Sequence, residues 1–452
     1  MGDAVTIHQP VDTSKTEIRS WAMYDWANSA FSTIVVTTLL GPYLSNLAQA
    51  TNGVRLGSMR FEPDAFFPTC VSLSVILQVF LLPLLGTIAD SSHLKKRLLL
   101  SLASLGAIAT MLLFFVQADM PVLGTNGAVL LGGLLFILAN LSFGAAVVLY
   151  NAFLPDIADP KDRDHVSSYG WALGYLGGGL ALAIALGLFT LMSDKGLAVR
   201  LGLALAGLWW FGFTMLFPAR HLRQRPPQKK LPAGENYFSY GIKQIVRTLR
   251  TMYREYPETL KYLIAYLIYN DGIQTVIVVA TIFAASELKV GADTLMILIL
   301  MIQFIAFFGA LLFGWMAGRM GAKKAIIISL IIWAAIVIYT YAFMYETWQL
   351  FAAGVFIAIV MGGSQALSRS LFSQMIPKDS ESEYFGFYEI SERGTSWIGT
   401  AVFAFAVQAT GSTRGALLAV ISFFVLGLLL LIPVNVRKAM QDAGNDPTGV
   451  VI

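Results

Sequence analysis

The chain has 452 residues, of which 56% are hydrophobic and only 13% are charged, and its formal net charge is +4. Soluble globular proteins carry about 25% charged residues, so this composition excludes an ordinary soluble domain. The leucine, isoleucine, valine and phenylalanine residues come in long runs rather than in short alternating segments. This pattern excludes a large β-barrel and indicates an all-α membrane protein with many spans.

Cysteine and histidine are too few and too scattered for a metal centre. Cys70 is the single cysteine, and the four histidines lie in polar connecting segments. We therefore expect no metal and no cofactor, and no nucleic-acid partner. The first apolar run starts at Trp21 and is long enough to span a membrane, so we interpret it as a mature helix rather than a signal peptide.

Twelve segments are near or above the ~20 apolar residues that a transmembrane helix needs. The predicted spans are residues 21–46, 67–90, 97–117, 126–153, 166–192, 198–218, 258–286, 292–318, 322–344, 348–376, 383–409 and 413–435. An even number of spans places both termini on one side. Most lysines and arginines fall on that side, and the opposite side holds Arg55, Arg60, Lys195, Arg200, Lys289 and Arg414. The positive-inside rule predicts cytoplasmic termini.

The longest connection follows the sixth span and divides the chain into two bundles of six spans. The predicted parts are an N-terminal segment 1–20, a bundle 21–218, a cytoplasmic linker 219–257, a bundle 258–435 and a cytoplasmic tail 436–452. Within the linker, one helical face collects apolar residues while basic residues occupy the other: Ile242, Ile245, Val246, Leu249 and Tyr253. This predicts a helix at the cytoplasmic membrane interface; a solvated linker with chance periodicity is the alternative.

The two bundles resemble each other in sequence. Span 2 ends GTIADSSHLKKR (86–97) and span 8 ends GWMAGRMGAKK (314–324). Span 1 carries Tyr24-Asp25, and span 7 carries Tyr269-Asn270-Asp271. Parallel six-span repeats are a known transporter architecture, in which the substrate site lies near the midplane between the repeats.

Polar residues gather on every third span. The candidates for substrate contact on spans 1, 4, 7 and 10 are Asn28, Asn151, Asp271, Gln274, Gln365 and Arg369. Span 5 instead carries glycines, which let helix backbones approach closely. We predict that these glycines form a packing surface: Gly170, Gly174, Gly177, Gly178 and Gly179.

Charges inside the predicted spans are the best indication of a site. A charge at the centre of a membrane helix costs roughly 2.5–3.5 kcal/mol on insertion scales, so such charges usually pair or face a cavity. Arg369 lies about as far before the break at Pro377 as Glu389 lies beyond Ser382, which predicts that they meet at one depth. Alternatively, Glu389 is neutralised by Arg393 four residues later. The candidate proton-coupling residues are Asp271, Glu389 and Asp25, because burial raises the pKa of a carboxylate.

The loop after span 2 is the predicted gate. Asp90 sits at a helix end, within reach of neighbouring helix ends and of the basic cluster that ends at Arg97. A charge pair there can hold one closed state and break in the other, which alternating access requires. A structural cap of a helix is the alternative role. Gly86 and, in the second bundle, Gly314 complete the gating set.

These segments together resemble the major facilitator superfamily, and both loops (86–97 and 314–324) resemble its loop signature. Further matching segments are YDWANSAF (24–31), YNAFLPDIA (150–158), GYLGG (174–178), YNDGIQT (269–275), SQALSRSLF (364–372) and FGFYEISE (385–392). The similarity is to the branch of the autophagy-associated vacuolar amino-acid effluxers and their bacterial relatives. It implies the major facilitator fold and amino acids as substrates. Gly318 stands where the first loop has Asp90, so the acid's gating role applies to the first bundle alone.

The leading hypothesis is a secondary active transporter of small polar solutes, with amino acids as the implied class and protons as the coupling ion. The sequence has no GxxxxGK[ST] motif, so ATP-driven pumping is not expected. A proton-linked exporter of organic anions or drugs is the alternative, since Arg369 suits an anion and Asp271 a cation. A receptor or assembly factor on a transporter fold is the alternative of another class. We expect a monomer in a bacterial cytoplasmic membrane and no enzyme activity.

Overall fold

The computed structural model describes residues 14–226, 237–393 and 396–452. Its first bundle contains the helices α1 (Lys15–Ala30), α2 (Leu40–Gln49), α3 (Pro63–Asp90), α4 (Lys95–Leu112), α5 (Gly124–Asn151), α6 (Leu154–Ile157), α7 (Arg163–Leu191), α8 (Lys195–Leu216) and α9 (Pro218–His221). A π-helix, η1 (Phe31–Leu39), joins α1 to α2, and the 3-10 turn η2 (Leu113–Phe115) follows α4. The short strands β1 (Val54–Leu56) and β2 (Met59–Phe61) pair antiparallel, with Arg55 opposite Arg60.

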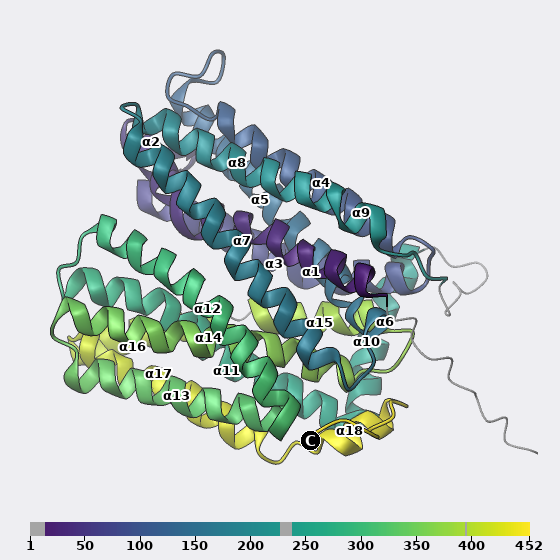
Figure 1. Cartoon of the computed structure of the whole chain (residues 1–452). Helices are drawn as coiled ribbons and strands as arrows, with labels where there is room; N and C mark the ends of the chain where they lie inside the picture. Colours follow the sequence, from purple (N-terminus) through teal and green to yellow (C-terminus); the bar gives the residue numbers. More distant parts are fainter. Residues whose placement is uncertain (1–13, 227–236, 394–395) are drawn as a thin grey trace, which may run out of the picture.

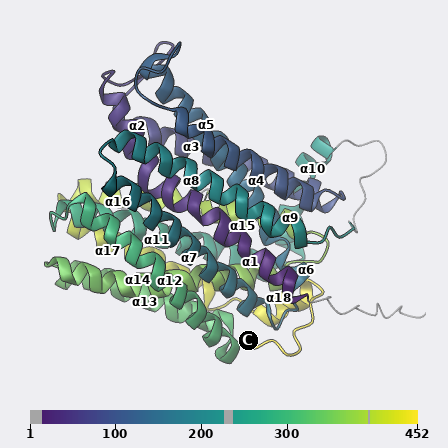
Figure 2. The ribbon, with the colours of Figure 1, turned by 45° about the horizontal axis from the view of Figure 1, so that its top comes forward.

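The second bundle follows the linker helix α10 (Tyr237–Arg254). Its helices are α11 (Pro257–Ser286), α12 (Ala292–Met320), α13 (Ala322–Phe343), α14 (Thr347–Gln374), α15 (Glu381–Arg393), α16 (Ser396–Thr410), α17 (Thr413–Leu431) and α18 (Val436–Asp442). In Figure 1 the first bundle, purple to teal, lies above the second, green to yellow. Figure 2 shows the same two layers after a turn of 45°. The chain is therefore an all-α protein of two helical bundles.

Eleven helical stretches among the described residues are long and apolar enough to cross a membrane. They agree with eleven of the twelve predicted spans. The twelfth, predicted as one helix over 383–409, is described as α15 and α16 on either side of residues 394–395. Residues 1–13 of the predicted N-terminal segment and 227–236 of the predicted linker lie outside the described residues.

Local sequence explains several helix ends. Pro63 and Pro257 stand at the first turn of α3 and α11, where the missing N–H removes no helical hydrogen bond. Asp194 caps α8 by accepting from the backbone N–H of Leu197 at 2.9 Å. The predicted break before Pro377 is confirmed, since α14 ends at Gln374.

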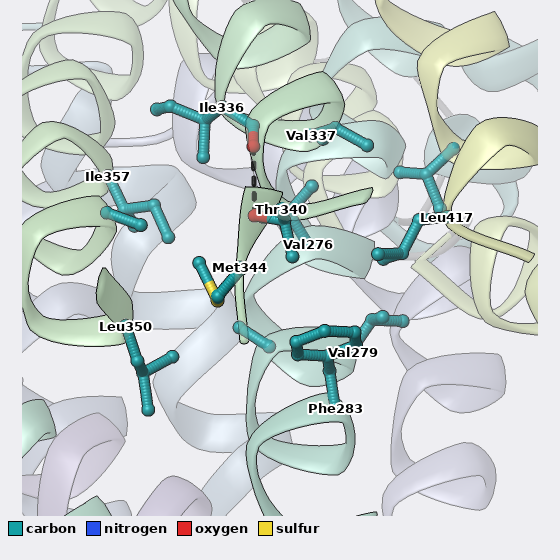
Figure 3. A pocket seen from close by; sticks show the side chains of 13 residues that line it. Val276, Val279, Phe283, Ile336, Val337, Thr340, Met344, Leu350, Ile357 and Leu417 are labelled. Carbon is teal, nitrogen blue, oxygen red and sulfur yellow. Dashed lines mark hydrogen bonds between the residues drawn. The ribbon is translucent and has the colours of Figure 1, made fainter. Parts of the chain in front are cut away.

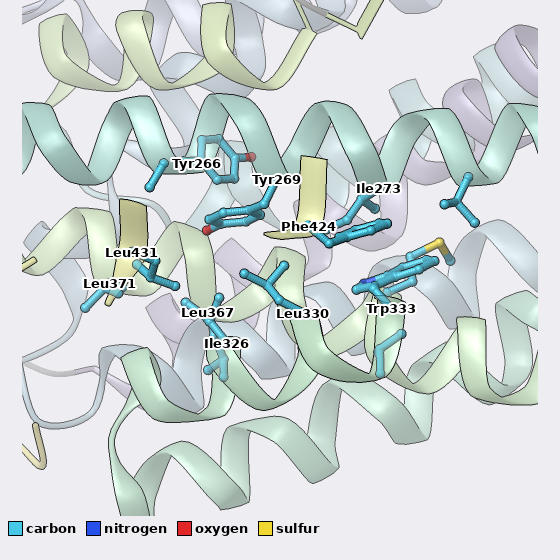
Figure 4. Packing of buried hydrophobic residues seen from close by; sticks show 14 of the residues in the cluster. Tyr266, Tyr269, Ile273, Ile326, Leu330, Trp333, Leu367, Leu371, Phe424 and Leu431 are labelled. Carbon is cyan, nitrogen blue, oxygen red and sulfur yellow. The ribbon is translucent and has the colours of Figure 1, made fainter. Parts of the chain in front are cut away.

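The core of the second bundle is built on α11. Figure 4 shows Tyr269 and Ile273 of α11 pointing toward Leu330 and Trp333 of α13 and toward Phe424 of α17. The Trp333 and Phe424 rings stack with centroids 5.9 Å apart. Large interlocking side chains of this kind fix the rotation of α11 about its axis, and this rotation decides which way its polar residues face.

The helix ends that carry the predicted polar residues lie together. We call the end of the molecule where α1 begins and where α3, α5 and α14 finish the proximal end. In Figure 1 this end is on the right, where α6, α10, α15 and α18 are drawn. Contacts between the two bundles lie there, among them those of Asp90 with α15 and of Arg163 with α14.

Candidate functional site

Arg369 on α14 joins the two bundles. Its Nη1 lies 3.0 Å from Asp25 Oδ2 on α1 and 3.3 Å from Asn151 Oδ1 on α5. Its Nε donates to Ser167 Oγ on α7 at 2.9 Å, and its Nη2 donates to the Ser167 carbonyl at 2.8 Å. The side chain is buried, with 3% of its surface exposed. We call Arg369, Asp25, Asn151 and Ser167 the arginine site.

Aromatic rings enclose the guanidinium of Arg369. Its Cζ lies 4.9 Å from the Trp21 ring centroid, 5.5 Å from Tyr150 and 5.4 Å from Trp171. Such contacts add cation–π attraction in a desolvated setting. Tyr150 also donates its hydroxyl to Asp25 Oδ2 at 2.7 Å. The cation and the carboxylate are thus each held by several partners, which offsets the cost of burying them.

The glycines of α7 leave the space that the side chains of the arginine site occupy. A Cβ at Gly170 would lie 2.7 Å from Asp25 Oδ2 and 3.0 Å from Arg369 Nη2. One turn further on, a Cβ at Gly174 would lie 2.9 Å from Ser29 Oγ. Because α1 packs so closely on α7, the predicted packing role of these glycines is confirmed.

The predicted pairing of Arg369 with Glu389 is wrong. Glu389 on α15 accepts from Arg393 Nε at 3.0 Å and from Asn151 Nδ2 at 2.8 Å. The alternative, neutralisation by the residue four positions later, is therefore the one observed. The similar spacing of Arg369 from Pro377 and of Glu389 from Ser382 indicated similar depth, but it gave no information about the direction in which each helix turns its side chain. Arg369 faces α1 and α7 instead.

Asp271 occupies a different environment from Asp25. It is 1% exposed on α11, and its carboxylate accepts a hydrogen bond from the backbone N–H of Gly399 on α16. Its Oδ1 has no hydrogen-bond partner among the described residues, and the same is true of Asn270 Oδ1 and Thr275 Oγ1. Asp271 is thus a buried carboxylate outside the arginine site, and its Oδ1 contacts no cation among the described residues.

The remaining substrate candidates divide between the two places. The Tyr175 hydroxyl on α7 donates to Gln365 Oε1 on α14, which is a further contact between bundles. Asn28 is buried on α1, three residues after Asp25. Gln274 is half-buried on α11, three residues after Asp271. The structure therefore joins Arg369 to Asn151 and Gln365 to Tyr175, whereas Asn28 and Gln274 lie one helical turn from Asp25 and Asp271.

Asp90 docks on a helix end of the opposite bundle. Its Oδ1 accepts from the backbone N–H of Ser382 at 3.1 Å, and its Oδ2 from that of Glu383 at 2.8 Å. These N–H groups begin α15, where the helix dipole favours an anion. A Cβ at Gly86 would lie only 2.2 Å from the Ser382 carbonyl oxygen, so α3 and α15 touch backbone to backbone. The predicted contact with a neighbouring helix end is confirmed.

Lys95, in the basic cluster near Asp90, forms its ion pair with another carboxylate. Lys95 Nζ forms its ion pair with Asp156 Oδ2 at 2.9 Å, and it also donates to the Ala152 carbonyl at 2.7 Å. Arg97 is exposed to solvent. Asp90 is held by the backbone N–H groups that begin α15, and a gating role for Arg97 stays a prediction.

A second set of contacts at the proximal end was not predicted. Arg163 Nη1 at the start of α7 donates to the Ser373 carbonyl of α14 at 2.7 Å. Asp164 Oδ1 accepts from Ser370 Oγ at 2.6 Å and from Gln374 Nε2 at 3.1 Å. The sequence contained a partial signal: the turn before span 5 is charged, and the end of span 10 carries serine and glutamine. Only the structure shows that the two segments face each other.

Gly314 brings α12 to the same helix. A Cβ at Gly314 would lie 2.6 Å from the Cβ of Ser168 on α7. The contact of α12 with α7 thus repeats the contact of α3 with α15, in which Gly86 has the equivalent place. Both glycines are thus close-contact positions, and their predicted part in gating stays a prediction.

One apolar pocket lies inside the second bundle, between α11, α13, α14 and α17 (Figure 3). Thirteen residues line it, among them Val279, Phe283, Met344 and Leu417, and none is a candidate site residue. Its Thr340 hydroxyl donates to the Ile336 carbonyl of its own helix at 2.9 Å. The rest of the lining is apolar, so this pocket offers little polar surface to a solute. In the part of the chain that the structure describes, no three His, Cys, Asp or Glu side chains gather to hold a metal.

Solved structures with the same arrangement define the class of protein. The fold matches the proton:xylose symporter XylE with a TM-score of 0.69 at 12% identity, over 92% of this chain and 94% of that one. It matches the human organic anion transporter MFSD10 with a TM-score of 0.67 at 13% identity, over 94% and 100% of the two chains. The chain therefore has the two-bundle fold of these transporters.

Sequence comparison gives the family within that class. The family described as "Vacuole effluxer Atg22 like" matches residues 13–444, and the chain belongs to it. The uncharacterised MFS-type transporter YxiO of Bacillus subtilis is 31% identical over 94% of this chain and 97% of its own. Autophagy-related protein 22-1 of Penicillium rubens is 27% identical over 95% and 92%. The resemblance seen in the sequence motifs is confirmed, and the chain is a transporter and no enzyme.

Proposed function

We propose that this protein is a secondary active transporter that carries amino acids across a bacterial cytoplasmic membrane by alternating access, coupled to protons. The observation that carries the proposal is Arg369, a buried cation of the second bundle whose hydrogen-bond partners among the described residues all belong to the first. A transporter that opens alternately to two sides must break contacts between its bundles on one side at a time. The arginine site is such a contact.

The arginine site supplies chemistry for a carboxylate. A guanidinium can hold a carboxylate with two parallel N–H groups, and Asp25 already uses this property. We propose that the carboxylate of an amino acid replaces Asp25 on Arg369 while the bundles rearrange. Asn28, Asn151 and Gln365 then serve as the neighbouring hydrogen-bonding groups. An organic anion would use the same cation, and it is the second candidate for that reason.

Protons would act on carboxylates that lie away from permanent partners. Asp271 is our first candidate, because its Oδ1 has no partner among the described residues. Asp25 is the second, since a proton on Asp25 would remove the negative charge that holds Arg369. Glu389 is the third, because Arg393 and Asn151 already hold it. Gln274, one turn from Asp271, would contact the substrate's other end.

We also propose the orientation and the gate. Both termini face the cytoplasm, since lysine and arginine gather on their side. The proximal end is then cytoplasmic, and the structure has Asp90 seated on α15 there. Asp90 and Gly86, with Gly314 on α12, hold that side closed. The protein would work as a monomer, because each chain contains both bundles.

Uptake into proteoliposomes tests this proposal. The purified protein is reconstituted and offered a labelled pool of amino acids and organic acids, with and without an imposed pH gradient. We expect accumulation of amino acids that depends on the gradient and is weakened by Arg369→Lys, which keeps the charge but loses the planar fork. Arg319→Lys, an exposed arginine on α12, is the matched control. Gradient-independent accumulation, or no loss in Arg369→Lys, would contradict the proposal.

A further inference from the structure

The linker helix α10 has three distinct faces. Gly241, Thr248 and Met252 face the protein, and Met252 is fully buried. At 100° per residue, a second face collects side chains that are apolar and exposed: Ile242 at 49%, Val246 at 63%, Leu249 at 45% and Tyr253 at 73%. A third face, beside the second, carries the exposed arginines Arg247, Arg250 and Arg254. A helix with only a solvated outer side would not separate its outer residues in this way.

The position of α10 indicates what covers its apolar face. The exposed side chains of α3 form one helical stripe that must face lipid: Leu73, Ile76, Leu77 and Phe80. Leu84 continues this stripe by one more turn toward the proximal end. A Cβ at Gly241 would lie 2.3 Å from Leu84 Cδ1, so α10 packs on that turn. The helix therefore lies at the border of the bilayer, where the lipid-facing surface of α3 ends.

Charge complementarity indicates the chemistry of the partner. Basic residues that flank an inserted apolar face are attracted to anionic headgroups. We propose that α10 binds the membrane surface through anionic phospholipid, with Val246 and Tyr253 inserted among the acyl chains and Arg247, Arg250 and Arg254 on the phosphates.

The inner face of α10 connects this surface to the gate. Thr248 Oγ1 donates to the side chain of Glu383, and the backbone N–H of Glu383 donates to Asp90. A lipid that holds α10 in place thus supports the helix end on which Asp90 is seated. The proposal therefore includes a consequence: anionic lipid stabilises the state in which the proximal end is closed. This consequence rests on the proposed gate and is independent of which solute is carried.

Insertion of the apolar face can be measured directly. Val246→Cys in a Cys70→Ala background is labelled with an environment-sensitive fluorophore, and the full-length protein is reconstituted in nanodiscs that contain phosphatidylcholine brominated on its acyl chains. We expect strong quenching at position 246 and weak quenching for a label at Arg247→Cys on the basic face. Equal, weak quenching at both positions would show that water or a soluble protein partner covers this face, and would overturn the proposal.

Coupling to the gate needs a second readout. Spin labels at Lys161→Cys and Gly318→Cys lie exposed on opposite bundles near the proximal end, and electron–electron resonance gives the populations of short and long distances between them. Adding phosphatidylglycerol to neutral nanodiscs should raise the ratio of short to long distances roughly fivefold or more, as expected for basic residues near an anionic surface. An unchanged ratio in the unsubstituted helix would contradict the coupling.

Matched variants separate this site from general surface charge. Arg247→Gln/Arg250→Gln/Arg254→Gln should abolish the lipid response. Three exposed basic residues elsewhere on the same side supply the control with equal loss of charge: Arg220→Gln/Arg437→Gln/Lys438→Gln. An equal loss of the lipid response in both triple variants would overturn the proposed lipid site on α10.

Thr248→Val should keep the fluorescence quenching and lose the change in distance. If this variant keeps both responses, the connection through Glu383 is wrong. None of these readouts requires transport, so a failure here would leave the transport proposal standing.

Discussion

Two aspartates in corresponding places of the two bundles have different surroundings. Asp25 follows Tyr24 in the first span, and Asp271 follows Tyr269-Asn270 in the seventh. Asp25 is held by Arg369 and Tyr150. Asp271 has a carboxylate oxygen without a partner among the described residues. The comparison shows that a repeated carboxylate need not keep repeated surroundings: Asp25 joins the bundles through Arg369, and Asp271 makes no such contact among the described residues.

Removing Arg369 should have the largest effect on stability. Arg369→Ala leaves the Asp25 carboxylate buried without its cation, which costs about 3–5 kcal/mol. The double variant Arg369→Ala/Asp25→Asn should recover part of that loss, because no buried charge is left unpaired. Thermal denaturation in detergent measures both. Arg319→Ala, at an exposed arginine, should change stability by less than about 0.5 kcal/mol. No recovery in the double variant would show that the pair is not the source of the loss.

Gly86 near the end of α3 and Gly318 near the end of α12 offer a second contrast, between a close-packed and an open glycine. Gly86→Val would force side-chain atoms into the Ser382 carbonyl and should cost about 1–3 kcal/mol. Gly318→Val meets nothing within 4 Å and should be nearly neutral. Denaturation midpoints of the two variants give the difference directly. Equal midpoints would mean that α3 and α15 are not in the close contact described.

Neutralising Asp90 should have a smaller effect. An asparagine there keeps an acceptor oxygen but loses the negative charge at the start of α15, which contributes about 0.3–2 kcal/mol. We expect Asp90→Asn to lower the population of the state closed at the proximal end, as reported by the spin labels at positions 161 and 318. Glu255→Gln, at an exposed acid, is the control. If unfolding is affected and the populations are not, Asp90 has only the structural role of a cap.

Asp271→Asn should change stability least. Asp271 has no ion pair with the residues that the structure describes, and an amide side chain fits the same space, so the change should stay within about 0.5 kcal/mol. We expect Asp271→Asn to change transport instead: accumulation driven by a pH gradient should disappear while counterflow exchange remains. A variant that still accumulates solute with unchanged pH dependence would leave Asp25 as the better proton candidate.

The sequence was sufficient to predict where most helices lie along the chain. It was not sufficient to predict which neighbours their side chains contact. Long apolar runs indicated eleven helices correctly, Pro377 marked the end of α14, and the apolar periodicity within 237–257 matches α10. The glycines of α7 were recognised as packing positions because small residues at helical spacing have few other roles.

The partners of the buried charges could not be obtained in the same way. Spacing from Pro377 indicated the depth of Arg369 but not its direction, and the residues that enclose it come from α1, α5 and α7. Asp90 binds backbone N–H groups, which carry no signature in the sequence. Trp21, Ser167 and Trp171 were missed since tryptophan and serine are common in membrane helices and identify no partner on their own.

The distance between the bundles at the proximal end is the most direct test of the arginine site. Spin labels at Lys161→Cys and Gly318→Cys are placed in the unsubstituted protein, in Asp25→Asn and in Asp271→Asn, each in identical nanodiscs. If the pair of Asp25 and Arg369 holds the bundles together, Asp25→Asn shifts the distribution toward longer distances and Asp271→Asn leaves it unchanged. A distribution that moves with Asp271→Asn and not with Asp25→Asn would contradict the account.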